Sequence, residues 1–158
     1  MIGKLLMDDH EATEGLTALE LPDDVNEKVT ALSREGDALA KAGRYAEAKQ
    51  AYLQALPLLP DNPNQWTAAA WLYVAIGDAS FHHGLYDEAF DAFFQAVQCP
   101  GGLGNPFIHL RLGQLYYEKG NLDKAADELT RAYMGAGFDI FCEDDSKYVD
   151  FLETRIQL

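Results

Sequence analysis

The sequence predicts an all-α protein built of three stacked helical hairpins, because one set of five positions occurs three times at a fixed spacing. In the second copy these positions are Gly77, Gly84, Tyr86, Ala89 and Phe93. Every position moves by 41 residues from the first copy to the second and by 36 from the second to the third. The equivalent residues are Gly36, Gly43, Tyr45, Ala48 and Tyr52 in the first copy, and Gly113, Gly120, Leu122, Ala125 and Leu129 in the third.

The residue types at these positions explain a helix-turn-helix unit. The second glycine ends a helix, where it can take the left-handed conformation that closes the turn. The tyrosine or leucine two positions later fills the angle between the helices. The alanine lets the second helix approach the first, and the large side chain four positions further on fills the remaining gap on the same face. The first glycine has the same role as the alanine, on the first helix.

Start and stop signals place the helices in order. The segment Pro22-Asp23-Asp24 starts a first hairpin, and Asn62-Pro63 and Asn105-Pro106 are typical of an N-cap followed by proline at the first helical position. Ser146 is expected to cap a last helix that covers the apolar face of the final hairpin. The predicted helices are about 23–42, 45–57, 63–83, 86–98, 106–119, 122–135 and 146–156.

These residues resemble the tetratricopeptide repeat, a helical hairpin of about 34 residues. The second copy reads Tyr73-x2-Ile76-Gly77 and Ala89-x3-Phe93, and the third reads His109-x2-Leu112-Gly113-x2-Tyr116 and Ala125-x3-Leu129. Glu35 and Ser80 depart from the family pattern, and no copy has the usual tryptophan. The resemblance implies a right-handed superhelix of three repeats. The expected organisation is an acidic arm over 1–24 and one domain over 25–158, with repeats at about 29–62, 70–103 and 106–137 and a capping helix at about 146–156.

Charge narrows the classes of partner. The chain has 26 acidic and 12 basic residues, a formal net charge of −14. Such a surface repels nucleic acid and anionic membranes and favours a basic protein, although a merely solvated surface explains it as well. The excess lies in residues 1–28, in residues 63–99, which have no Lys or Arg, and in residues 138–158.

The sequence offers no catalytic, metal or cofactor site. His82 and His83 are adjacent and point in different directions on a helix, and the glycine-rich segment 101–104 lacks the lysine and preceding strand of a phosphate loop. The two cysteines suggest no disulfide framework. No apolar run approaches the ~20 residues of a membrane span. We therefore expect a non-enzymatic protein of the reducing cytoplasm.

The family resemblance implies a binding surface on the concave face, formed by the first helix of each hairpin. Repeat positions 2, 5, 9 and 12 point into it, and an aromatic centre beside acids would hold an apolar anchor and a Lys or Arg. The alternative is that Trp71, Phe81 and Phe107 pack between neighbouring helices or under the N-terminal arm. The candidate residues are Asp37, Trp71, Val74, Asp78, Phe81, His82, Phe107, Arg111, Gln114 and Tyr117.

The leading functional hypothesis is an immunity protein that occludes a basic toxin or effector domain, since small acidic repeat proteins of this kind resemble bacterial immunity proteins. Type III translocator chaperones also resemble this chain in length, acidity and three-repeat layout, and they bind an extended peptide. A general scaffold or co-chaperone is a third possibility. The groove lacks the Lys, Asn and Arg clamp of members that bind a C-terminal carboxylate. The sequence leaves the oligomeric state open.

Overall fold

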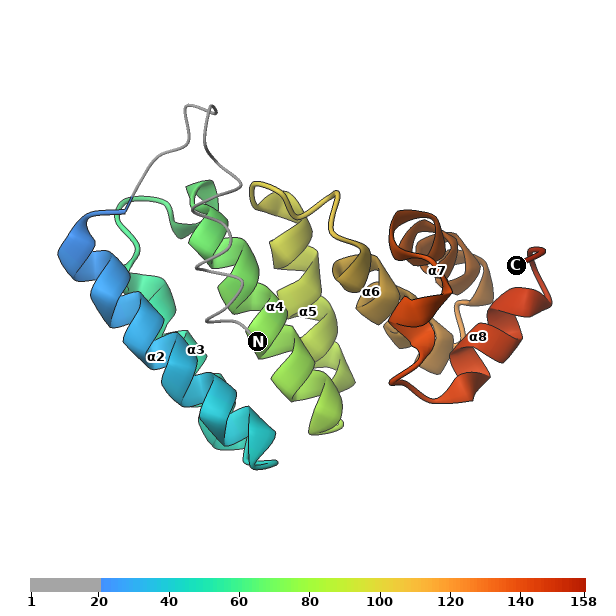
Figure 1. The fold of residues 1–158 in the computed structure, drawn as a ribbon, viewed down its shortest axis with the longest axis horizontal. Coiled ribbons are helices and arrows are strands. Elements are labelled where there is room, and N and C mark those ends of the chain that lie inside the picture. The colour runs from blue at the N-terminus through green and yellow to red at the C-terminus, as the bar shows by residue number, and fades with distance from the viewer. Residues whose placement is uncertain (1–20) are drawn as a thin grey trace. The chain divides into compact units, whose positions relative to one another are not determined.

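The computed structural model describes residues 21–158, and within that range every regular element is helical. These residues divide between two compact units, one ending at Gly101 and the other spanning Gly102–Leu158 (Figure 1). The prediction of one domain over 25–158 stays a prediction. The predicted arm over 1–24 lies outside the described residues except for its last four positions.

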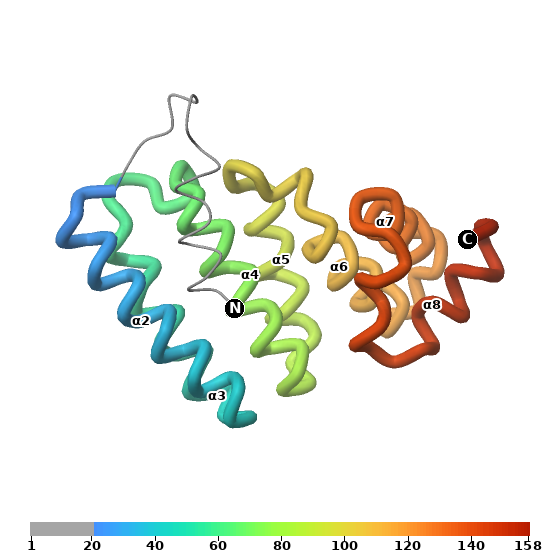
Figure 2. Tube along the Cα trace, viewed as in Figure 1, coloured from blue at the N-terminus to red at the C-terminus, as the bar shows by residue number. Residues whose placement is uncertain are grey.

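The first unit contains two helical hairpins, traced in Figure 2. Helix α2 (Asp23–Lys41) pairs with α3 (Tyr45–Ala55), and α4 (Thr67–His82) pairs with α5 (Tyr86–Gln98). The turn glycines Gly43 and Gly84 have φ angles of 76° and 77°, in the left-handed region. Only glycine takes this region routinely, so the expected turn chemistry is confirmed in both hairpins.

The first glycine of each repeat lets its two helices approach closely. A Cβ added at Gly77 would lie 2.7 Å from the Phe93 ring, and one added at Gly113 would lie 2.6 Å from Cγ of Leu129. Tyr52 occupies the same place over Gly36. The helices of each hairpin are thus held together by a large side chain seated on a glycine, as the repeated pattern predicts.

Helix α4 is buried on both sides, as its nearly continuous apolar sequence predicts. It packs against α3 of the preceding hairpin and against its own partner α5. The side chains of Leu72 and Ala69 are fully buried in the core of the first unit. This core also takes in Val29, Ala48, Tyr52, Ala55, Leu59, Trp66 and Cys99.

The predicted continuous helix over 63–83 is wrong at its start. Residues Pro63–Gln65 form a separate 3-10 turn, and Trp66 is extended, with φ −99° and ψ 137°. The Trp66 indole Nε1 donates a hydrogen bond of 2.7 Å to the carbonyl oxygen of Pro60. This contact anchors the loop and breaks the helix, so α4 begins only at Thr67.

The second unit contains the third hairpin and a C-terminal cover. Helix α6 (Pro106–Glu118) pairs with α7 (Leu122–Ala136), and a 3-10 segment (Phe138–Phe141) leads to α8 (Ser146–Glu153). The Asn105 side chain caps α6 by accepting from the Phe107 amide at 2.9 Å, as predicted. The core of this unit joins residues of all four elements: Leu110, Leu129, Ala132, Phe141, Val149 and Leu152.

The predicted start and end of the last helix need correction. The cap is Asp145, whose Oδ1 accepts from the Lys147 amide at 2.9 Å, and not Ser146, which is the first helical residue. The helix ends at Glu153 and not near residue 156. No helix among residues 21–158 combines the length and apolarity needed to cross a membrane.

Candidate partner-binding site

In the first unit, one carboxylate accepts a hydrogen bond from a buried phenol, and a second carboxylate adds its negative charge. The Tyr52 hydroxyl donates a hydrogen bond of 2.8 Å to Oδ1 of Asp37, and the Tyr52 side chain is only 2% exposed. Burial raises the pKa of Tyr52, and the hydrogen bond to Asp37 and the negative charges of Asp37 and Asp78 raise it further. Asp37 comes from α2 and Asp78 from α4, so acids on the first helices of successive repeats both act on the Tyr52 phenol.

Aromatic side chains surround the end of α4 next to these acids. The His82 ring stacks on Tyr45 with centroids 5.4 Å apart, and its Nε2 lies 3.5 Å from Oδ1 of Asp78. Phe81 meets the edge of His82 at 5.7 Å and the ring of Tyr86 at 5.6 Å. His82 and Tyr86 are exposed, and the other two rings are half-buried. A cation placed among these aromatic rings would lie close to ring faces and to the carboxylate of Asp78.

The two remaining candidates of the first unit are less accessible. Val74 is buried, and Trp71 is half-buried against the core of the first unit. The Trp71 indole Nε1 is buried and has no hydrogen-bond partner among the described residues. Leaving such a donor unsatisfied costs about 1–3 kcal/mol.

In the second unit, Arg111 and Gln114 belong to an internal polar network. Nη1 of Arg111 donates to Oε1 of Gln114 at 2.7 Å and to Oδ1 of Asp144 at 3.0 Å. Nε2 of Gln114 donates to Oδ2 of Asp144 at 3.1 Å. Gln114 is fully buried and Arg111 is 5% exposed. Both side chains are hydrogen-bonded to Asp144, in the segment that precedes α8.

The aromatic candidates of α6 are also in contact with their own unit. The Arg111 guanidinium lies 4.8 Å from the centre of the Phe107 ring. Tyr117 packs against Tyr148 and Phe151 of α8, with centroids 5.5 and 5.2 Å apart. The C-terminal segment thus lies on the face of α6 that the repeat pattern assigned to a partner.

The sequence reasoning missed several members of these clusters. Tyr45 and Tyr86 open the second helices of their hairpins, and Tyr52 was assigned to the core alone. The repeat pattern could have identified Tyr45 and Tyr86, because each follows a turn glycine by two positions. Asp144 carries no comparable signal, since it lies in a loop outside the repeats. Among residues 21–158, no group of three His, Cys, Asp or Glu side chains could hold a metal ion.

The comparisons with known proteins agree with the hairpin architecture. Family models described as tetratricopeptide repeat match residues 29–62 and 104–139. No curated protein matches the chain. Among solved structures, the chain is similar to the type III secretion translocator chaperone SycD of Yersinia enterocolitica, with a TM-score of 0.63 and 18% identity over 81% of this chain and 91% of that one. At this identity the likeness concerns the fold.

The matched repeats indicate the general kind of function. Tetratricopeptide repeats form a non-catalytic scaffold for protein–protein interaction, and stacked units present extended surfaces to a protein or peptide partner. The site residues themselves stay a prediction. The matched repeats and the glycine-seated hairpins show that the chain contains tetratricopeptide repeats.

Proposed function

We propose that the protein binds an extended, basic segment of another protein, as a chaperone does, through the α2 and α4 face of the first unit. The observation that carries this proposal is the bond of Asp37 to the Tyr52 hydroxyl, together with the placement of Asp78 beside the ring of His82, which Phe81 also contacts. The acids would receive a Lys or Arg side chain, and the rings would receive the apolar residue beside it.

The charge of the first unit supports a basic ligand. Residues 21–101 hold eleven acids and five bases, a net charge of −6. Such an excess attracts a cationic segment at long range and speeds its association at low salt. The fold similarity to a chaperone chain favours an extended ligand over a compact one.

The first unit is the better half of the predicted surface for this purpose. In the second unit Gln114, Arg111 and Tyr117 already contact the C-terminal segment. A ligand there would have to displace buried hydrogen bonds. At the end of α4, by contrast, His82 has a side chain that is 38% exposed.

A peptide titration tests the proposal. The probe is a fluorescein-labelled extended peptide with alternating Lys and Leu residues, compared with one in which Glu replaces Lys. Fluorescence anisotropy at low salt should show binding of the Lys peptide only. Asp37→Asn and Asp78→Asn should each weaken binding about 1.4- to fivefold, since a half-exposed ion pair contributes ~0.2–1 kcal/mol.

Asp91→Asn is the matched control, because Asp91 is an exposed acid of α5 in the same unit and the change removes the same charge. It should leave the dissociation constant unchanged within the error of the titration, because Asp91 is not expected to contact the peptide. Equal binding of the Glu peptide, or equal effects of all three substitutions, would contradict a specific acidic site.

An immunity protein remains a second candidate, favoured by the overall net charge of −14. It would occlude a folded basic domain and not an extended segment. Co-expression separates the two, since an immunity protein rescues growth from a toxic domain whereas a chaperone raises the soluble yield of an unfolded segment. We also propose a cytoplasmic location, in keeping with the free thiols of Cys99 and Cys142.

A further inference from the structure

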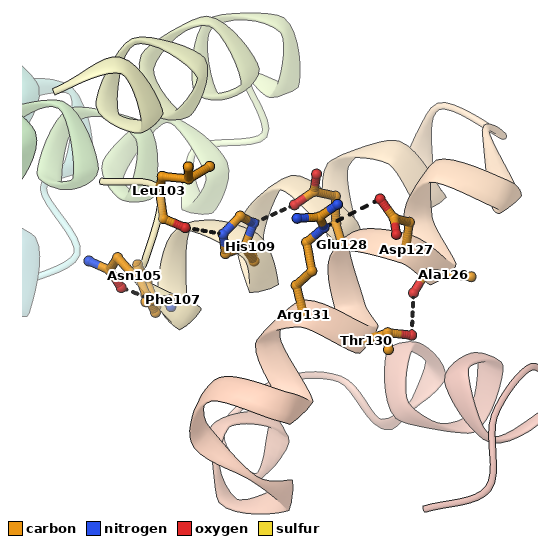
Figure 3. Close-up of polar contacts among 9 residues, drawn as sticks. All are labelled: Leu103, Asn105, Phe107, His109, Ala126, Asp127, Glu128, Thr130 and Arg131. Carbon is orange, nitrogen blue, oxygen red and sulfur yellow. Dashed lines mark hydrogen bonds and ion pairs between the residues drawn. The ribbon is translucent and has the colours of Figure 1, made fainter. Parts of the chain in front are cut away.

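A buried histidine joins three segments of the second unit (Figure 3). The Nδ1 atom of His109, on α6, lies 2.6 Å from Oε2 of Glu128, on α7. The Nε2 atom lies 2.7 Å from the carbonyl oxygen of Leu103, in the glycine-rich loop that precedes α6. The residue is 7% exposed, so water does not replace these contacts easily.

Counting donors and acceptors shows that this arrangement holds one proton more than a neutral imidazole and a carboxylate have together. A carbonyl oxygen only accepts, so Nε2 must carry a hydrogen. An ionised carboxylate also only accepts, so Nδ1 must carry one as well, unless Glu128 is itself protonated. With either placement of the proton, the contact between His109 and Glu128 contains a proton that a base can remove.

We propose that His109 is a proton-dependent clamp on the loop that precedes α6, released at Leu103 when this proton is lost. The proton leaves to solvent and no other covalent bond breaks. The ring then keeps a single N–H for two acceptors, the Glu128 carboxylate and the Leu103 carbonyl oxygen. A hydrogen bond to a carboxylate is about twice as strong as one to a neutral carbonyl. The neutral ring therefore keeps Nδ1–H on Glu128 and presents a lone pair on Nε2 to the Leu103 oxygen, which repels it.

The other charged groups around the clamp have partners of their own, and Glu128 is the acidic side chain in contact with the ring. On α7, Arg131 and Asp127 pair with each other, with Nε and Oδ2 3.4 Å apart. On α6, Arg111 is engaged with Asp144. The loop contributes a backbone carbonyl, and its Asn105 side chain is used in capping α6.

Glu128→Gln is the decisive variant. The glutamine amide can donate to Nδ1 of a neutral ring, which then keeps Nε2–H for the Leu103 carbonyl. The loop contact should therefore survive at high pH in this variant and be lost in the unchanged protein. His83→Gln is the control, since His83 is an exposed histidine at the end of α4.

The measurement is NMR of the full chain with labelled histidine nitrogen and backbone carbonyl carbon, between pH 5 and 9. The Leu103 carbonyl signal should move upfield with the same midpoint as the loss of the His109 proton. Over the same range, exchange of the Asn105 amide, which is bonded to the Gly102 carbonyl, should accelerate about three- to tenfold after correction for its intrinsic rate.

Glu128→Gln should abolish both changes and His83→Gln should leave both intact. The clamp is disproved if the Leu103 signal is unaffected while His109 titrates, or if it moves equally in Glu128→Gln. It is also disproved if the ring is a neutral Nε2–H tautomer throughout. None of these results depends on a bound partner, so they leave the proposed function untouched.

Discussion

Gly77 and Phe93 are in close contact across the second hairpin, with the Phe93 ring lying where a side chain on Gly77 would begin. Phe93 is fully buried, so a methyl group added at Gly77 would have to displace a packed ring. The same relationship joins Gly113 to Leu129 in the third hairpin. Helix pairing in this protein therefore depends on the absence of a single methyl group in each repeat.

We expect Gly77→Ala to destabilise the protein by about 1–3 kcal/mol, the range for forcing extra carbon into a packed core. This cost outweighs the small gain in helix propensity that alanine brings. Urea unfolding followed by circular dichroism measures the change. Gly104→Ala is the matched control, because a Cβ there meets nothing within 4 Å. A midpoint for Gly77→Ala equal to that of the control would show that Phe93 can move aside.

The network around Arg111 gives a second prediction. Asp144→Ala leaves the buried guanidinium without its carboxylate, and removing one member of a buried ion pair costs about 3 kcal/mol. The loss should appear as a lower urea midpoint. Asp150→Ala, at an exposed position of α8, should stay within about 0.5 kcal/mol of the unchanged protein. Similar midpoints for the two variants would mean that the network does not stabilise the C-terminal segment.

The Tyr52 phenol predicts a loss of stability at high pH. Its pKa is raised by burial and by the bond to Asp37, so the folded state favours the protonated form. The pKa of tyrosine in the unfolded chain is about 10. The stabilisation by the protonated phenol is therefore complete below this pH and declines as the pH rises above it. The free energy of unfolding should fall less between pH 8 and 11 in Tyr52→Phe than in the unchanged protein. Tyr86→Phe, at an exposed position, should retain the original slope.

For Glu118 we expect the opposite pH dependence of stability, at low pH. Burial alone would raise its pKa, but hydrogen bonds with Lys147 and Tyr148 outweigh that effect and lower it. Its contribution is therefore present above about pH 4.3 and is lost as the pH falls further. Glu118→Gln should reduce the acid-induced loss of stability between pH 5 and 3. An unchanged slope would indicate that α8 is held by its apolar contacts alone.

The two cysteines should differ in reactivity. Burial raises the pKa of Cys99 to about 11, and its side chain is 4% exposed, whereas Cys142 is exposed. Iodoacetamide at pH 8 should therefore label one site, because the thiolate is the reactive form. Mass spectrometry after proteolysis should find the label on Cys142, and Cys142→Ser should prevent labelling of the folded protein. Rapid labelling of Cys99 would show that the first unit opens readily.

The hairpins could be predicted from local rules, whereas the contents of the site could not. Gly43, Gly84 and Asn105 act within a few residues of themselves, so their turn and capping roles follow from the sequence. The helix start at Asn62-Pro63 was wrong because the Trp66 side chain bonds the carbonyl of Pro60, six positions back, and this side-chain contact is not part of the helix-start signal. The placement of Asp144 against Gln114 joins residues 30 apart through a loop of no regular pattern.

By itself, the sequence determined that this chain is a series of close-packed helical hairpins, because a glycine opposite a large side chain is a short-range constraint that repeats along the chain. Only the tertiary structure decided which polar groups those hairpins bring together. Asp37 and Tyr52, and likewise His109 and Glu128, meet across helices whose separation and angle depend on the whole packed unit. Arg111 meets Asp144 only because the segment before α8 folds back onto α6.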